Sequence, residues 1–210
     1  CWKAGGTASS NSNGSITSSV SANTTYGFSI ATYTGNGTSG ATIGHGLSSA
    51  PKWMLVKRRN DTAFWEVYHT SVGNDKVMYL NNTDMETSSS ASWNNTDPTS
   101  SVFTVGNSSG TNASGSTYVA YCWSEIAGFS KFGEYSGSCS NPVKVTTGFK
   151  PKFVIIKGKD VDSSPSGYRG WGMYQEPVTS QQLQANCSGP IGTRGNCGTG
   201  SNARDIQANV

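Results

Sequence analysis

Charged side chains are scarce in this sequence. Lysine, arginine, aspartate and glutamate make up 13% of its 210 residues, against about 25% in an ordinary globular domain. The net charge is only +3, whereas proteins that bind nucleic acids gather lysine and arginine on one face. The densest basic run, residues 57–59, is short and suits the end of a strand. The composition therefore argues against a nucleic-acid partner.

Long apolar runs and helical patterns are also lacking. No stretch approaches the ~20 apolar residues that span a membrane, so we expect no membrane partner. Only residues 179–185 offer a helical turn, and their single leucine leaves that turn without an apolar face. The absence of amphipathic helices points away from α-containing folds.

The motifs of common enzymes and metal sites are missing too. The sequence has no GxSxG, HExxH or phosphate-binding loop. His45 and His69 have no partner in a motif, and we expect both to be structural. Asp160 and Asp162 lack the glycine and glutamate of a calcium loop, which favours a solvated turn. We predict no catalytic residue, no metal and no cofactor, and hence a protein that is not an enzyme.

The chain contains five cysteines, an odd number: Cys1, Cys122, Cys139, Cys187 and Cys197. Cys187 and Cys197 bracket the glycine-rich segment "CSGPIGTRGNC", a spacing that a disulfide can close, and neither lies in a CxxC pair typical of zinc. Two free thiols are the alternative. A disulfide here would indicate an oxidising or extracellular location.

The sequence is rich in aromatic residues and in short β-type segments. Runs of β-branched and aromatic residues alternate with clusters of Gly, Ser, Asn and Asp, which predicts strands joined by turns. In "TYVAYCW" both alternating faces carry apolar groups, as in an interior strand of a sandwich. We therefore predict an all-β, antiparallel β-sandwich. The expected strands cover residues 28–34, 52–58, 64–69, 76–81, 101–105 and 116–123.

An internal repeat is the strongest pattern in the chain. Residues 26–37 resemble 127–139, residues 46–59 resemble 148–159, and "FWEVYH" at 64–69 corresponds to "GWGMYQ" at 170–175. The offset stays between about 100 and 106 residues, which indicates one supersecondary plan used twice.

The repeat also divides the chain. We predict a first β module at 27–127 and an incomplete second module at 128–210. Residues 1–26 are expected to be the end of an upstream module followed by a polar linker, because "CW" at 1–2 matches "CW" at 122–123. On this interpretation the chain is a window from a longer polypeptide of tandem modules.

One polar loop is a candidate sugar site. Carbohydrate-binding surfaces combine an exposed aromatic ring with amide, carboxylate and hydroxyl groups. Trp93 is followed by Asn94, Asn95 and Asp97, which predicts a ligand-binding site at these four residues. The alternative is that Trp93 folds back to cap the core, the commoner fate of a tryptophan.

Several motifs together resemble a family of repeated β modules in structural proteins of tailed phages, described as tail-fibre or concanavalin-A-like lectin modules. They are "WKAGG" (2–6), "NGSITSSVSANTTYGFSIATYTGNG" (13–37), "GHGLSSAPKWMLVKRR" (44–59), "WNNTDPTSSVFTVG" (93–106) and "NASGSTYVAYCWSEIAGFSKFGEYSG" (112–137). The resemblance ends after Tyr174. It implies a jelly-roll or lectin-like sandwich, a place on the virion surface, other virion proteins as partners, and a trimer.

Three functional hypotheses follow. The first is a virion structural protein, a fibre or adhesion component whose ligand would be host-surface polysaccharide. The second is a capsid decoration or cement protein without a ligand. The third is a glycan depolymerase, which needs two carboxylates about 5 or about 6.5–9.5 Å apart. In the sequence Glu66, Glu125 and Glu134 stand singly.

Overall fold

The structure of the chain is a computed structural model. It describes residues 2–136, 143–159 and 170–176, together with the backbone of residues 178–184, 192–193 and 208–209. The described part is almost entirely β-structure, as predicted, with a single helix of four residues, α1 (Ser90–Trp93).

The chain divides into two compact units. Unit 1 contains Cys1–Tyr79 and Thr87–Ile126, and unit 2 contains Leu80–Glu86 and Ala127–Val210. The boundary after Ile126 lies within a residue of the one predicted from the repeat. Unit 1, however, also includes residues 1–26, which we predicted to be the end of an upstream module and a linker.

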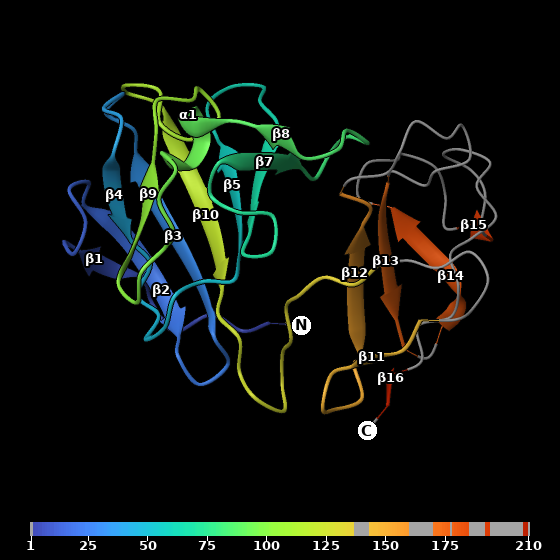
Figure 1. Ribbon diagram of the computed structural model, residues 1–210. Helices are drawn as coiled ribbons and strands as arrows, with labels where there is room; N and C mark the ends of the chain where they lie inside the picture. The colour runs from blue at the N-terminus through green and yellow to red at the C-terminus, as the bar shows by residue number, and fades with distance from the viewer. Residues whose placement is uncertain are drawn as a thin grey trace. The chain divides into compact units, whose positions relative to one another are not determined.

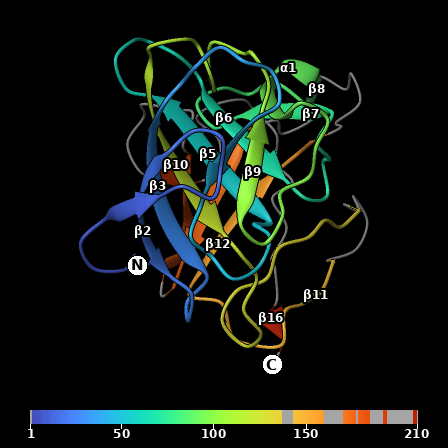
Figure 2. The same cartoon turned by 90° about the vertical axis from the view of Figure 1, so that its left-hand side faces the viewer.

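Unit 1 is built on an eight-stranded antiparallel sheet in the order β1-β2-β3-β10-β5-β6-β7-β8, with a second sheet of two strands, β4 and β9 (Figure 1). Seen from the side of β1, strands β2, β3, β10 and β5 run next to one another (Figure 2). The strands are β1 (Ser9–Asn11), β2 (Ser18–Asn23), β3 (Phe28–Thr34), β4 (Ala41–Gly44), β5 (Trp53–Arg58), β6 (Trp65–His69), β7 (Lys76–Tyr79), β8 (Thr87–Ser88), β9 (Val102–Val105) and β10 (Thr117–Trp123).

The core lies between the large sheet and the β4–β9 pair. In β10, Tyr118, Ala120 and Cys122 are fully buried and point to this core, which we call the core face of the sheet. Ile43 of β4 and Phe103 of β9 close it from the other side, and both are also fully buried. The alternation predicted for "TYVAYCW" is confirmed.

The outer face of the large sheet carries a cluster of aromatic rings. Trp53 and Trp123 stack with their ring centroids 4.4 Å apart. Phe28 lies 5.0 Å from Trp123, and Trp2 meets Trp123 edge-on at 5.6 Å. Aromatic pairs in these geometries add stability beyond the area they bury. Both faces of the central strands are therefore apolar.

The prediction of a polar linker is wrong for residues 9–11 and 18–23, which form β1 and β2. Ile16, Ser18 and Val20 are buried at every second position, and the Ser18 hydroxyl donates to the Gly44 carbonyl at 2.8 Å. A serine takes one of the inward positions, so the segment lacks the apolar alternation by which strands are recognised. β2 is nevertheless a strand, because it pairs with β3 through backbone hydrogen bonds, and the local sequence does not reveal this pairing.

Unit 2 repeats a hairpin of unit 1. In unit 1, β5 pairs with β6 so that Lys57 faces Trp65. In unit 2, β12 (Phe153–Lys157) pairs with β13 (Trp171–Gln175) so that Lys157 faces Trp171. The predicted repeat is therefore a repeat of strand register.

The remaining strands of unit 2 form two groups. β14 (Val178–Gln184) and β15 (Gly192–Thr193) extend the sheet of β12 and β13. β11 (Val145–Thr146) pairs in parallel with β16 (Ala208–Asn209).

Candidate functional site

Trp93, the ring proposed to stack on a sugar, lies in the core of unit 1. Its exposed fraction is 1%, and it meets Tyr68 edge-on with the ring centroids 5.9 Å apart. Helix α1 ends at this residue, and the left-handed backbone of Asn94 (φ 53°) turns the chain away. The indole offers no face to a ligand, so the structure shows the core-capping alternative.

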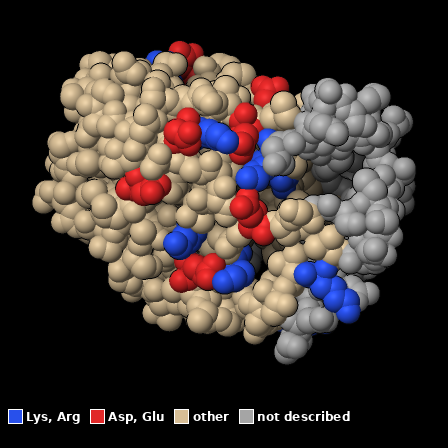
Figure 3. All heavy atoms as spheres, viewed as in Figure 1, with Lys and Arg blue, Asp and Glu red and all other residues tan. Residues whose placement is uncertain are grey.

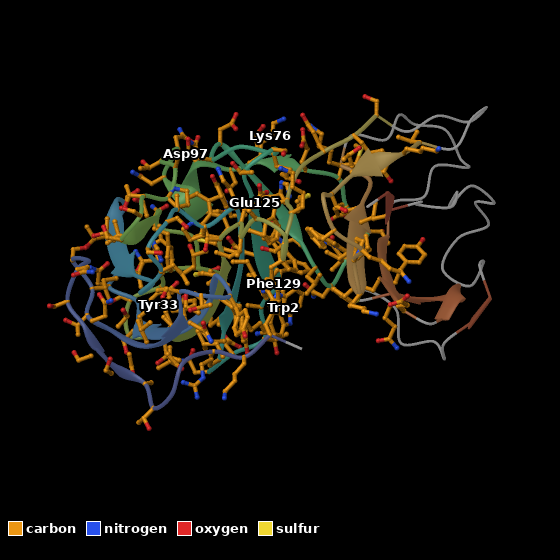
Figure 4. All side chains as sticks on the ribbon, turned by 90° about the horizontal axis from the view of Figure 1, so that it is seen from below. Trp2, Tyr33, Lys76, Asp97, Glu125 and Phe129 are labelled. Atoms are coloured by element: carbon orange, nitrogen blue, oxygen red, sulfur yellow. The ribbon has the colours of Figure 1, made fainter. Side chains whose placement is uncertain are left out.

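The three polar residues of the predicted site, Asn94, Asn95 and Asp97, lie at the surface, in a loop that hydrogen bonds hold to the rest of unit 1. Asn94 accepts a hydrogen bond from the Ser39 hydroxyl at 2.9 Å. Asp97, which lies at the edge of unit 1 (Figure 4), accepts one from the Tyr68 hydroxyl at 3.1 Å. Asn95 is exposed, and its backbone has the left-handed conformation (φ 48°), which asparagine tolerates well. A ligand role for these three residues stays a prediction.

Asn112 ties two neighbouring loops together from inside the fold. Its side chain is fully buried. The amide oxygen accepts from the Asn36 backbone N–H at 2.9 Å, and Nδ2 donates to the carbonyls of Thr38 and Gly106 at 2.9 and 2.8 Å. One side chain thus fixes the β3–β4 loop against the β9–β10 loop.

Two stacked tyrosines fasten the β9–β10 loop, residues 106–116, to the large sheet. The rings of Tyr33 and Tyr118 lie 5.2 Å apart. Tyr33 donates its hydroxyl proton to the Thr111 carbonyl at 2.7 Å, and Tyr118 donates to the Ser109 carbonyl at 2.8 Å. Burial raises the pKa of both phenols, so they remain protonated donors.

Glu66 is a buried carboxyl group beneath the same loop. Its Oε1 accepts a hydrogen bond from the Ser108 hydroxyl at 2.8 Å, and Oε2 is buried without a hydrogen-bond partner among the described residues. Burial raises the pKa of Glu66, and hydrogen bonds from Ser108 and Ser92 oppose this only in part. The site favours the neutral acid.

Glu66 is the buried acid of the described part of the chain. No group of three His, Cys, Asp or Glu side chains able to hold a metal occurs among the described residues. Asp160 and Asp162 lie outside them.

Both histidines have structural hydrogen bonds. In His45, which is fully buried, Nδ1 accepts from the Leu47 N–H at 3.1 Å and Nε2 donates to the Thr99 carbonyl at 3.2 Å. Burial lowers the pKa of His45, which keeps the ring neutral. His69 accepts from the Ser71 N–H at 3.1 Å. The hypothesis of a turn histidine is confirmed for His45.

The cysteines contribute no reactive site among the described residues. Cys122 is a free thiol in the core, and burial raises its pKa to about 12, so it is not a nucleophile. Cys187 and Cys197, the candidate disulfide, lie outside the described residues.

The surface of unit 1 is poor in charge on one side. Lys3 is the only Lys, Arg, Asp or Glu in the first 51 residues, which include β1 to β4. In the space-filling view a broad area on the left has no charged side chain, and the charges gather nearer the middle (Figure 3). Hydroxyl and amide groups therefore supply the polarity of this surface.

Sequence reasoning missed Phe64, which it placed in a strand. Phe64 precedes β6 and is 50% exposed, more than any other large hydrophobic side chain of the described residues. Its ring lies 4.8 Å from that of Tyr79. The repeat contains a signal of this exposure. The corresponding position of the second copy is Gly170, so the shared fold does not require an aromatic ring there.

Residues 1–209 match one protein-family model, described as a domain of unknown function, DUF7483. No curated protein matches the chain, and no solved structure does. Among the described residues no helix is long and apolar enough to cross a membrane.

Proposed function

This chain belongs to the DUF7483 family, and we propose that it is a structural protein of a tailed-phage particle, a fibre or adhesion component that holds polar loops outward. The observation that carries the proposal is the buried hydrogen-bond network of Asn112, Tyr33 and Tyr118, which fixes the loops on the sandwich. Loops of fixed shape bind without a large cost of ordering. A rigid sheet with shaped loops is a common design for binding modules.

The surface chemistry supports an exposed structural role. A surface of hydroxyls and amides with few charges offers many hydrogen-bonding groups to polysaccharide. The repeat supports it as well, because a hairpin with the same register in both units suits a polypeptide assembled from tandem modules. The motifs that resemble phage modules include β3, β5, β9 and β10, the strands that build the core.

The partners proposed for the protein are other virion proteins, further copies of the chain in a trimer, and host-surface polysaccharide. Its proposed location is the surface of the virion. Capsid decoration without a ligand is the second candidate, since the same rigid sandwich would serve it.

A glycan depolymerase is less well supported. An acid with a raised pKa, such as Glu66, is what a general acid requires. Glu66, however, lies beneath the β9–β10 loop and is bound to Ser108, and no second carboxylate accompanies it in the buried part of unit 1 that the structure describes.

Mass spectrometry of gradient-purified particles of the encoding phage tests the proposal. The expected result is that peptides of the chain copurify with the major virion proteins at a constant ratio. Peptides found only in infected-cell lysate, and absent from purified particles, would contradict it.

A further inference from the structure

We propose that the bend between β1 and β2 carries a site of spontaneous deamidation, at which Asn13 is converted to aspartate and isoaspartate. The reaction needs no partner other than water, so it is independent of the proposed virion function. It gives the protein a covalent modification that accumulates with age, on a part of unit 1 that is otherwise poor in charge.

The chain contains two Asn-Gly pairs, Asn13–Gly14 and Asn36–Gly37. This dipeptide is especially susceptible to deamidation, because glycine has no Cβ to shield its backbone nitrogen from the preceding side chain. Both asparagines are exposed. Sequence and exposure therefore do not distinguish the two pairs, and their hydrogen bonds decide which one reacts.

The reaction begins when the Gly14 nitrogen attacks Cγ of Asn13. A new N–Cγ bond closes a cyclic succinimide, and the side-chain amide group leaves as ammonia with the proton of the Gly14 nitrogen. Water then opens the ring. Cleavage of the bond to Cγ gives aspartate, and cleavage of the bond to the backbone carbonyl carbon gives isoaspartate, whose main chain runs through Cβ and Cγ.

Hydrogen bonds hold Asn36 away from this reaction. Its Oδ1 accepts from the Thr38 N–H at 2.8 Å and from Asn112 Nδ2 at 3.4 Å. The nitrogen that would attack, that of Gly37, donates to the Asn112 carbonyl at 2.9 Å. These bonds must break before the Gly37 nitrogen can reach Cγ, and breaking them raises the barrier.

Asn13 lacks these restraints. Its backbone N–H donates to Asn11 Oδ1 at 3.0 Å. Among the described residues, however, neither its side-chain amide nor the Gly14 N–H has a hydrogen-bond partner. The side chain can therefore turn toward the Gly14 nitrogen without breaking a hydrogen bond.

The contacts that follow Gly14 make the two products differ. A Cβ on Gly14 would lie 2.3 Å from the Thr42 carbonyl oxygen. The Ser15 N–H donates to Thr42 Oγ1 at 2.8 Å, and the Thr42 N–H donates to Ser15 Oγ at 2.9 Å. The chain is thus packed against β4 directly after the reactive bond. Aspartate keeps the length of the main chain, whereas isoaspartate adds a methylene group to it and should loosen this contact.

Both products also add a negative charge. Lys3 is the only Lys, Arg, Asp or Glu in the first 51 residues, so one new carboxylate changes the net charge of this segment from +1 to zero.

The test is a time course of the full folded chain at mildly alkaline pH, followed by digestion and peptide mass spectrometry. Chymotrypsin separates the two sites, because Tyr26 and Phe28 lie between them. We expect Asn13 to deamidate at least about tenfold faster than Asn36, as the loss of one or two hydrogen bonds predicts. In guanidinium chloride the two sites should react at similar rates, since the unfolded chain has neither set of contacts.

Asn13→Gln is the matched variant, because glutamine keeps the amide group but cyclises far more slowly. Circular dichroism before ageing verifies that the variant is folded. The aged unmodified chain should melt at a lower temperature as isoaspartate accumulates, and the aged Asn13→Gln variant should not.

Two outcomes would overturn the inference. One is a ratio of the Asn13 rate to the Asn36 rate that is no larger in the folded chain than in guanidinium chloride. The other is an equal loss of melting temperature on ageing in the unmodified chain and in Asn13→Gln. Neither outcome bears on the virion proposal, which mass spectrometry of particles tests separately.

Discussion

Glu66 and Asn112 are both buried polar residues, but they differ in how completely their atoms are bonded. Asn112 has partners for its oxygen and for both of its amide hydrogens. Glu66 leaves Oε2 without a partner among the described residues. A satisfied buried amide stabilises the fold, whereas a partly satisfied carboxyl group makes stability depend on pH.

Replacement of Glu66 by glutamine should remove one component of the pH dependence of stability. Burial raises the folded-state pKa of Glu66 above 4.5, the ordinary value of a glutamate carboxyl group. Between the unfolded and folded pKa values the folded state binds more protons, so the free energy of unfolding falls as pH rises through this window. Glutamine does not ionise, so the variant should gain stability relative to the unmodified protein as pH increases. Urea denaturation of both proteins from pH 4 to pH 8 measures this, and parallel curves would contradict it.

Replacement of Asn112 by alanine should cost about 2–4 kcal/mol, because the buried Gly106 carbonyl and two partly buried backbone groups, the Asn36 N–H and the Thr38 carbonyl, lose their partner. Asn107 lies in the same loop and is exposed, so Asn107→Ala serves as the control and should change stability by no more than about 0.5 kcal/mol. Both values come from chemical denaturation at neutral pH. Equal effects of the two substitutions would mean that Asn112 does not fasten the loops.

The contacts of Asn112, Glu66 and Trp93 could not be predicted from the sequence, because each joins residues that are far apart in the chain. Asn112 bonds to Asn36 across 76 positions, and Ser108 bonds to Glu66 across 42. Trp93 packs on Tyr68, which is far away in the chain. Local patterns of polarity contain no information about which distant segments meet, so an exposed and a buried tryptophan look alike in a polar loop.

At the scale of elements, the β3–β4 loop packs closely against the β9–β10 loop at Gly35. A Cβ on Gly35 would lie 2.5 Å from the Ala113 carbonyl oxygen and 3.0 Å from a ring carbon of Tyr118. The Gly35 N–H donates to the Ser116 carbonyl at 2.8 Å, and its carbonyl accepts from the Gly115 N–H at 2.9 Å. The two loops can approach this closely only because Gly35 has no side chain.

Gly35→Ala should therefore push the β3–β4 and β9–β10 loops apart and cost about 1–3 kcal/mol. Gly6→Ala is the matched control, since a Cβ there meets nothing within 4 Å. Thermal melts of the two variants measure the difference. A melting temperature of Gly35→Ala equal to that of Gly6→Ala would contradict this packing.

The strands themselves were largely predictable. The segments expected at 28–34, 64–69 and 116–123 correspond to β3, β6 and β10 within one residue at each end. Their alternating apolar and aromatic residues reflect burial on the sheet. β2 and β4 were missed because serine and alanine take many of their inward positions, and small residues do not produce the alternating pattern.

At the scale of the whole molecule, the repeat was the most informative pattern in the sequence. It set the boundary between the copies one residue from the division after Ile126, and it aligned Lys57 with Lys157 and Trp65 with Trp171. The structure places these aligned residues at equivalent positions of a hairpin in each unit. The repeat did not predict that the N-terminal residues join unit 1, because they have no counterpart in the second copy. The copies also differ, since the exposed Phe64 of the first copy corresponds to Gly170 in the second.

Immunogold electron microscopy of intact phage particles, with antibodies raised against the folded chain, tests the central proposal of a virion surface protein most directly. We predict gold at regular positions on the outside of particles, at fibres if the protein is adhesive and over the capsid if it is a decoration protein. Absence of label from intact particles, with clear labelling of the protein in infected-cell lysate by the same antibodies, would contradict the account.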